Sequence, residues 1–408
     1  MAKRNCLIAQ SGGPTCAINA SVVGVLDENR KVRYYDRIYA GIHGIEGILD
    51  KKIIDLTKLT YEDFKLLKYT PSSSLGSCRY RLRDFEYDDE EYVRFFNILE
   101  SLNIHTFFYI GGNDSMDTVN KLSEYAKLNG IDRQFIGIPK TIDNDLDYTD
   151  HAPGYGSAAK YIATLALETY LDSSVYINNG IFILETMGRD TGWLAASASL
   201  AKLNGRQIAD FIYLPEVVFS EEDFLRDVRK RFKEKNKVYI VVSEGLKDKN
   251  GNYLYDTEPI DDSFSHPQLG GVGIYLKNLI VNEGTTRRVK VLQLGTAQRC
   301  AMHIASKTDI EEAYLVGKNA LKYAVEGYTG FMIALNRLGN NPYRVETFRV
   351  EISKVANRVK HFPRKWITDE NNNVTRETID YINPLILGEA SLSLEDGIPN
   401  YLFILDNI

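Results

Sequence analysis

Short runs of apolar residues recur along the chain, and most of them stop abruptly at glycine, carboxylate or hydroxyl residues. Six runs stand out, at residues 5–10, 107–110, 135–138, 181–185, 238–243 and 289–294. Between them lie stretches in which apolar residues return every three or four positions, as in amphipathic helices. Buried strands that alternate with helices predict an α/β protein with parallel sheets and with ligands at the carboxyl ends of the strands.

The pattern also places elements outside these six runs. A short strand is expected at residues 37–40, and helices are expected after Gly13, at 88–97 and at 309–330. The charged, asparagine-containing stretch 369–373 is typical of a loop.

Composition narrows the class of protein. A chain of 408 residues with 44% hydrophobic content can bury a large core and is expected to form two domains. The net charge of -6 comes from interspersed charges, which leaves no basic face for nucleic acid. Apolar runs stay well short of the roughly 20 residues that span a membrane. Four cysteines without CxxC spacing favour buried thiols in a reducing compartment, so we expect a soluble cytoplasmic protein.

The first strand-like run ends in Ser11, Gly12 and Gly13, and a helical pattern follows. In such a turn the glycines let main-chain N–H groups close on an anion, and the helix N-terminus adds its positive end. A plain tight turn is the alternative. Arg79, which follows Gly76 and Ser77 in a loop rich in hydroxyls, is a second candidate for binding phosphate oxygens.

Two later loops carry the densest chemistry. Residues 111–115 read Gly-Gly-Asn-Asp-Ser and residues 139–145 read Pro-Lys-Thr-Ile-Asp-Asn-Asp, each directly after an apolar run. Together they hold Lys140, Asp114, Asp143 and Asp145, which suit binding of a phosphate chain through a metal ion and removal of a hydroxyl proton. Asp114 at a helix start is either an ordinary N-cap or a ligand of that site.

These motifs, in this order, resemble those of the phosphofructokinases. The resemblance covers residue 5 to about residue 330, and it rests on segments 11–13, 76–79, 111–115, 139–145, 187–189 and 298–299. It implies two Rossmann-like α/β domains with largely parallel sheets that face each other across an active-site cleft. Residues 1–154 with about 298–345 would bind the phosphoryl donor, and 155–297 with about 346–408 the sugar phosphate. The resemblance also implies a homodimer or homotetramer.

The resemblance implies roles for individual residues in phosphorylating the 1-hydroxyl of fructose 6-phosphate. Asp143 would be the general base, Arg189 would stabilise the transferring group, and Lys140 and Asp114 would also take part in catalysis. The remaining roles form three sets. Thr141, Ile142, Asp143, Met187, Gly188, Arg189, Glu244, Thr296 and Arg299 would bind the sugar phosphate; Gly12, Gly13, Arg79 and Lys140 the diphosphate; and Asn113, Asp114 and Asp145 a magnesium ion.

Asp114 and Lys140 bear on the choice of donor. Nucleotide-using members usually carry small residues at both positions. A carboxylate at 114 would repel the α-phosphate of a nucleotide, and the ammonium at 140 would stand beside pyrophosphate or the departing phosphate. The chain therefore resembles the pyrophosphate-dependent branch, whose reaction is reversible. An ATP-dependent 6-phosphofructokinase and a non-catalytic sugar-phosphate-binding paralogue are the alternatives, and sedoheptulose 7-phosphate is a possible additional acceptor.

Four positions depart from the family pattern. Asn113 replaces a metal-binding aspartate, Thr296 a histidine or tyrosine near the sugar phosphate, and Cys300 a frequent glycine. Gly180 stands where nucleotide-using bacterial enzymes have an arginine that reaches across a subunit interface. The resemblance leaves Arg287, Arg288 or Lys290 as candidates for such a cross-subunit contact.

Overall fold

The computed structural model describes residues 4–177, 180–255 and 269–407, and they form two compact units. Unit 1 comprises the described residues within Met1–Ser157, Arg299–Val359 and Gly388–Ile408, and unit 2 those within Ala158–Gln298 and Lys360–Leu387. This division differs from the expected domains after residue 345. Much of the C-terminal segment belongs with unit 1, and only Lys360–Leu387 belongs with unit 2.

Unit 1 is built on a seven-stranded sheet of order β13-β12-β5-β4-β1-β2-β3. The five strands from β12 to β2 run parallel, and β3 and β13 are antiparallel to their neighbours. The strand bounds are β1 (Arg4–Gln10), β2 (Tyr35–Gly41), β3 (Ile53–Asp55), β4 (Ile104–Gly111), β5 (Gln134–Pro139), β12 (Phe331–Asn340) and β13 (Tyr343–Glu351).

Helices cover both faces of this sheet. On one face lie α1 (Ile18–Val32), α3 (Tyr61–Lys68) and α11 (Lys307–Val325), and on the other α2 (Gly44–Leu49), α4 (Glu90–Ser101) and α5 (Asn113–Leu128). Successive side chains of a strand enter opposite cores, as when Ile8 joins the first and Leu7 the second. Because both faces are buried, the central strands read as continuous apolar runs.

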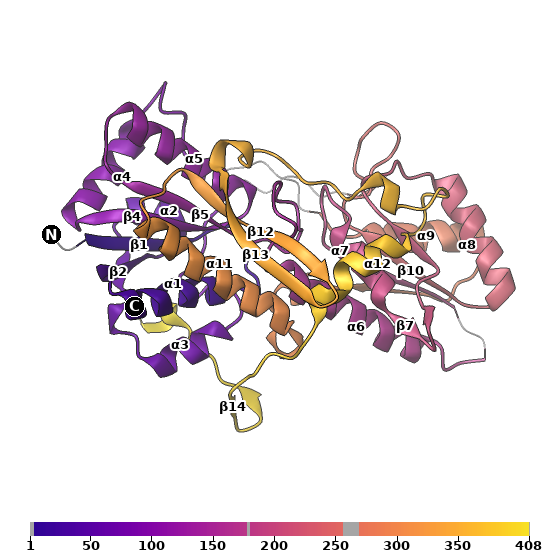
Figure 1. The fold of residues 1–408 in the computed structure, drawn as a ribbon. Helices are drawn as coiled ribbons and strands as arrows, with labels where there is room; N and C mark the ends of the chain where they lie inside the picture. Colours follow the sequence, from indigo (N-terminus) through magenta and orange to yellow (C-terminus); the bar gives the residue numbers. More distant parts are fainter. Residues whose placement is uncertain (1–3, 178–179, 256–268, 408) are drawn as a thin grey trace. The chain divides into compact units, whose positions relative to one another are not determined.

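Helices α1 and α11 pack unusually close together (Figure 1). A Cβ atom on Gly24 would collide with the main-chain oxygen of Tyr314, and one on Gly317 would collide with that of Ser21. The two glycines therefore set the distance between a helix near the N-terminus and one near the C-terminus. Ser306 begins α11 by accepting a 3.4 Å hydrogen bond from the Asp309 N–H.

The chain returns to unit 1 through the hairpin of β12 and β13. Met332 pairs with Gly137 of β5, so the returning strand extends the sheet laid down by the first part of the chain. Farther on, the Leu402 N–H donates to the Thr70 hydroxyl at 3.0 Å, which ties the C-terminal residues to the same unit. A two-stranded turn of β14 (Leu394–Glu395) and β15 (Ile398–Pro399) precedes that contact.

Unit 2 contains a four-stranded parallel sheet of order β11-β6-β10-β9. The bounds are β6 (Ile181–Thr186), β9 (Phe211–Tyr213), β10 (Val238–Ser243) and β11 (Val289–Gln293), with a separate pair, β7 (Lys202–Leu203) and β8 (Arg206–Gln207). Helices α8 (Glu221–Lys235) and α9 (Val272–Glu283) share one core with this sheet. The helix α6 (Tyr155–Ser173), which begins at the end of unit 1, reaches β10 through a 2.7 Å hydrogen bond between Thr169 and Tyr239.

An aromatic cluster joins the C-terminal segment of unit 2 to α7 (Trp193–Ser197). The Trp193 ring lies 4.9 Å from Phe362, 5.2 Å from Tyr381 and 6.0 Å from Trp366, measured between ring centroids. Tyr381 comes from α12 (Arg376–Ile382). The stretch 369–373 is a loop, as expected.

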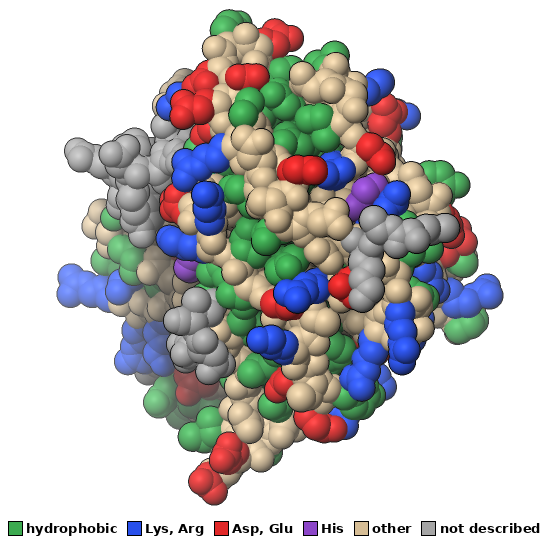
Figure 2. Space-filling view, turned by 90° about the vertical axis from the view of Figure 1, so that its left-hand side faces the viewer, with side chains coloured by type: hydrophobic (Ala, Val, Ile, Leu, Met, Phe, Trp, Pro, Cys, Tyr) green, Lys and Arg blue, Asp and Glu red, His purple; other side chains and the backbone are tan. Residues whose placement is uncertain are grey.

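Cys6, Cys16 and Cys78 are buried, whereas Cys300 is exposed, so the expectation of burial was wrong for that residue. Cys300 ends the four-residue helix α10 (Ala297–Cys300), in which Gln298 is the buried residue. Basic and acidic side chains are interspersed over the face drawn in Figure 2. Within residues 4–177, 180–255 and 269–407, no helix is both long and apolar enough to cross a membrane.

Candidate active site

In unit 1 the turn after β1 lies directly over a buried lysine. The Lys140 ammonium donates hydrogen bonds to the main-chain oxygens of Ser11 at 2.8 Å and Gly13 at 2.6 Å. Gly12 has a φ of +75°, and a Cβ atom there would lie 3.3 Å from the Lys140 ammonium. The turn and the lysine therefore lie in direct contact at the carboxyl ends of β1 and β5.

Burial dominates the electrostatics of Lys140, which is 2% exposed. Loss of hydration lowers its pKa from 10.5 to about 8. Asp143 and Asp145 oppose this shift, whereas the positive charges of Arg299 and Arg79 add to it. The same four side chains are thus close enough to Lys140 to affect its charge, and all of them belong to unit 1.

A polar network holds the Arg79 loop beside the turn. Gln10 donates to Asn19 at 2.8 Å and accepts from the Leu75 N–H at 3.0 Å. The Ser77 hydroxyl donates to the main-chain oxygen of Gly12 at 2.6 Å. Because these contacts are buried or half-buried, they fix the approach of the loop while Arg79 itself stays exposed.

The loop after β4 opens α5, as the sequence predicted. Gly112 is the N-cap residue, so Asp114 lies in the first turn rather than at the cap. Asp114 is exposed, which leaves its carboxylate accessible at the positive end of the helix. Neighbouring Asn113 donates a 3.4 Å hydrogen bond to the Asp145 main-chain oxygen, while its own amide oxygen Oδ1 is buried and has no hydrogen-bond partner.

The Lys140–Asp145 loop is fixed at several points. The Lys140 N–H donates to Gly111 at 3.0 Å and the Thr141 N–H to Pro153 at 3.1 Å. The Thr141 hydroxyl accepts from the Asp143 N–H at 3.1 Å. Ile142 is buried, whereas Asp143 and Asp145 are half-buried and thus reachable by a ligand.

Arg299 belongs to unit 1, next to the turn after β1. A Cβ atom on Gly13 would lie 3.3 Å from its guanidinium NH1. The Cys16 thiol donates to the Arg299 main-chain oxygen at 3.6 Å, which holds the arginine near the start of α1. Of the residues expected to bind the sugar phosphate, Thr141, Ile142, Asp143 and Arg299 therefore lie in unit 1.

Unit 2 carries a second group of predicted residues at the ends of β6 and β10. Glu244 donates its N–H to Thr186 at 2.9 Å, and the Gly245 N–H donates to Gly188 at 3.2 Å. The Met187 N–H donates to the Gln298 side chain at 3.3 Å. The structure thus brings Met187, Gly188, Arg189 and Glu244 to one edge of the sheet, with Thr296 exposed just beyond β11.

Comparisons with known proteins identify the family of the chain. A family model described as "Phosphofructokinase" matches residues 5–324. The chain belongs to the phosphofructokinase family. It is 40% identical over 407 residues to a protein of Methylococcus capsulatus and 39% over 405 residues to one of Xanthomonas campestris, each match covering 98% of this chain and 96% of the relative. Both relatives are named pyrophosphate--fructose 6-phosphate 1-phosphotransferase.

A solved structure gives the same result for the fold. The pyrophosphate-dependent phosphofructokinase of Nitrosospira multiformis matches with a TM-score of 0.88 and 37% identity, over 98% of this chain and 96% of that one. The expected phosphofructokinase fold, with its two largely parallel sheets, is confirmed. The match also includes the C-terminal residues, for which the sequence motifs carried no information.

The donor set fits the magnesium ion that phosphofructokinases require. Asn113 Oδ1 is a buried oxygen without a hydrogen-bond partner, and the main-chain oxygen of Asp145 lies beside the same amide. Among the described residues, no three histidine, cysteine or carboxylate side chains group as a metal site. A small number of protein ligands is typical of Mg²⁺ sites. The ion usually keeps several waters and is bound through one or two carboxylates and the phosphates of its substrate.

The departure at Gly180 has a structural cause. A Cβ atom there would collide with the main-chain oxygen of Arg288 and lie 2.9 Å from the Arg288 Cβ. β6 and β11 are neighbours, so this strand start has no room for the arginine of nucleotide-using bacterial enzymes.

Residues that support the site were missed from the sequence. Asn19, Asn144 and His151 are buried and hydrogen-bonded around the two loops. Asn144 lies between two aspartates and has a φ of 53°. Asparagine adopts this left-handed conformation more readily than most residues, and that was the available signal.

Proposed function

We propose that this chain is a pyrophosphate-dependent 6-phosphofructokinase. It transfers a phosphoryl group from pyrophosphate to the 1-hydroxyl of fructose 6-phosphate, which yields fructose 1,6-bisphosphate and orthophosphate. The observation that carries the proposal is the buried Lys140 ammonium beneath the Ser11–Gly13 turn. The names of the relatives with about 40% identity support the same activity.

Asp143 is the general base of the proposed reaction. As the 1-hydroxyl oxygen forms its bond to the transferred phosphorus, Asp143 takes the hydroxyl proton, and the bond to the bridging oxygen breaks. That electron pair leaves with orthophosphate. The reverse reaction returns the proton from Asp143 to the hydroxyl, which is consistent with a reversible enzyme.

Positive groups and the metal balance the charge of the donor. Gly12, Gly13, Arg79 and Lys140 hold the diphosphate. Asn113, Asp114 and Asp145 would hold Mg²⁺, which would supply positive charge to the phosphate oxygens.

Asp114 sets the choice of donor in this proposal. Its exposed carboxylate at the start of α5 repels the additional phosphate of a nucleotide, whereas pyrophosphate ends short of it. Lys140 places a positive charge beside pyrophosphate or the departing phosphate. A nucleotide, which is a larger donor, would obtain such stabilisation from other contacts.

The acceptor-binding residues follow from the family resemblance. The residues proposed to hold fructose 6-phosphate are Thr141, Ile142, Met187, Gly188, Arg189, Glu244, Thr296 and Arg299, and Arg189 stabilises the transferring phosphoryl group. Unit 1 is accordingly the donor-binding domain and unit 2 the main sugar-phosphate domain. The active form is a cytoplasmic homodimer or homotetramer, and Arg287, Arg288 or Lys290 would supply a contact across its interface.

A panel of donors tests the proposal. The wild-type protein is assayed with pyrophosphate and with ATP, in both directions, with Mg²⁺ present. We expect turnover with pyrophosphate to exceed turnover with ATP by orders of magnitude, and we expect Asp114→Gly to lose most of it. A higher rate with ATP would overturn the donor assignment. Calorimetric binding of fructose 6-phosphate without turnover in any combination would instead favour the non-catalytic paralogue.

A further inference from the structure

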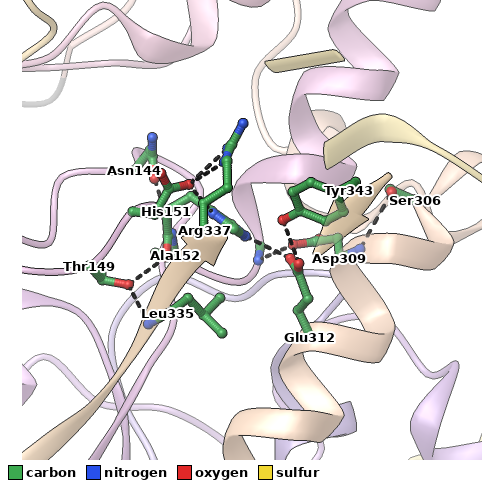
Figure 3. A network of polar contacts seen from close by, with 12 residues as sticks. Asn144, Thr149, His151, Ala152, Ser306, Asp309, Glu312, Leu335, Arg337 and Tyr343 are labelled. Atoms are coloured by element: carbon green, nitrogen blue, oxygen red, sulfur yellow. Dashed lines mark hydrogen bonds and ion pairs between the residues drawn. The ribbon is translucent and has the colours of Figure 1, made fainter. Parts of the chain in front are cut away.

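The Lys140–Asp145 loop continues into a segment that is held by a buried ionic network (Figure 3). Both ring nitrogens of His151 face carboxylates, Nδ1 at 2.7 Å from Asp150 and Nε2 at 2.6 Å from Glu312. The His151 side chain is 1% exposed. An ionised carboxylate can only accept, so a proton on each nitrogen, which makes the ring an imidazolium, satisfies both contacts.

Side chains of three further elements, α11, β12 and β13, contribute to this network. Glu312 comes from α11 and accepts a 2.6 Å hydrogen bond from the Tyr343 hydroxyl of β13. Arg337 of β12 donates to Asp150 at 2.8 and 3.0 Å. Two cations thus match two carboxylates. A neutral His151 would leave one buried carboxylate uncompensated, which is costly in a site that excludes water. Asp309, one turn before Glu312, is another buried acid nearby.

The network reaches the Asp143 loop through one short link. The Ala152 N–H, adjacent to His151, donates to Asn144 Oδ1 at 3.0 Å. Asn144 is fully buried and left-handed, with a φ of 53°, and stands between Asp143 and Asp145. Its amide therefore fixes the main chain from which both carboxylates project.

We propose that His151 and Glu312 are positioning residues for the loop that carries Asp143, acting through the hydrogen bond between Ala152 and Asn144. The inference rests on the proposed function, since it assigns these residues a part in the same reaction. With exposures of 1% and 5%, His151 and Glu312 are closed to a ligand. Their contribution is to keep the general base within reach of the 1-hydroxyl, and misplacement of a reacting group by 1 Å can cost on the order of 100-fold in rate.

The charge state of His151 makes this support dependent on pH. Burial disfavours the charged ring, but the carboxylates of Glu312 and Asp150 outweigh it and raise its pKa from 6.5 to about 9. The stabilisation is fully present below pH 6.5 and is lost as the pH rises through about 9. Lys140 titrates lower, at about 8, so kinetics alone would mix the two groups.

Two variants and a matched control test the proposal. Glu312→Gln keeps the shape but removes the charge that holds the imidazolium. We expect the pKa of His151, followed by NMR of the ring nitrogens, to fall from about 9 to below about 7, because burial is then opposed mainly by Asp150. At neutral pH we expect kcat to fall by about 100-fold in His151→Gln and by a smaller factor in Glu312→Gln, where part of the His151 rings stay protonated, with little change in either KM. His105→Gln alters another buried histidine, on β4, and should change neither kcat nor its pH profile.

A positioning role differs from a general folding defect. Acidification should restore kcat in Glu312→Gln, because it protonates His151 again, but not in His151→Gln. Amide hydrogen exchange at Ala152 should rise in both variants while exchange within β4 stays unchanged. A wild-type pH profile in Glu312→Gln, or a neutral His151 ring in the wild type at neutral pH, would overturn the inference. The NMR and exchange results do not need turnover, so they separate its failure from a failure of the proposed activity.

Discussion

The Lys140 ammonium donates a hydrogen bond of 2.6 Å to the main-chain oxygen of Gly13. This bond links the loop after β5 to the turn after β1 and leaves a cation with little hydration beneath the turn. Because burial lowers the Lys140 pKa to about 8, the cation is lost as the pH rises through that value. We expect kcat/KM for pyrophosphate to fall above this pH by about tenfold per unit.

Lys140→Met removes the charge and keeps the length of the side chain. We expect it to lower pyrophosphate-dependent turnover by about 100-fold to 1,000-fold. Lys121→Met is the matched control, since Lys121 also donates to a main-chain oxygen, that of Leu82 at 3.0 Å, but lies on α5 away from the turn. Equal rates in the two variants would remove Lys140 from the mechanism.

Asn113 offers a direct test of the metal site. Its Oδ1 is buried without a hydrogen-bond partner, so we expect Asn113→Ala to raise the Mg²⁺ concentration needed for half-maximal rate by about tenfold. Asn113→Asp should lower that concentration, because a carboxylate is a stronger ligand. Asn120→Ala, on the same helix, should leave it unchanged. If all three variants respond to Mg²⁺ alike, Asn113 is not a ligand.

The crossing of α1 and α11 predicts a large loss of stability on a small change. Gly317→Ala would place a methyl group against the Ser21 main-chain oxygen, which forces the helices apart. We expect a loss of about 3 kcal/mol in the free energy of unfolding, measured with urea. Gly205→Ala, at a φ of +76° with no atom within 4 Å, should cost about 1 kcal/mol from backbone strain alone. A smaller loss in Gly317→Ala than in this control would contradict the prediction.

The aromatic cluster predicts a role for the segment Lys360–Leu387 in stabilising unit 2. Trp193→Leu removes three ring contacts at a side chain that is 2% exposed, and we expect it to cost about 3 kcal/mol. Trp366 remains as a fluorescent reporter in the variant, because the sequence has two tryptophans. Tyr87→Leu, at an exposed aromatic, should cost nearly nothing, and an equal loss in both variants would contradict the prediction.

The sequence predicted strands best where both faces are buried. The run at residues 238–243 matches β10 at both ends, and the glycine and aspartate loops begin where β4 and β5 end. These strands are recognisable because burial on two faces leaves an uninterrupted apolar run that ends sharply. The location of Asp114 and of the Lys140–Asp145 loop followed from those ends.

The hairpin of β12 and β13 was missed. Only residues 331–335 of β12 are buried, and the rest of the hairpin mostly alternates half-buried and exposed positions. The turn residues Gly339, Asn340, Asn341 and Pro342 were the available signal. Local sequence patterns could not predict that Lys140 is buried or that His151 is an imidazolium. Their partners, such as Ser11 and Glu312, lie more than a hundred positions away in the sequence.

The pairing of β12 with β5 has a consequence for synthesis of the chain. A ribosome completes the first five strands long before it reaches Phe331, so the nascent polypeptide carries an unpaired edge of β5 while the whole of Ala158–Gln298 emerges. The surface of α1 around Gly24 likewise stays uncovered until α11 has been synthesised. Unit 1 thus reaches its native state only after release of nearly the entire chain, and a chaperone that shields the β5 edge during that interval would raise the yield of folded enzyme.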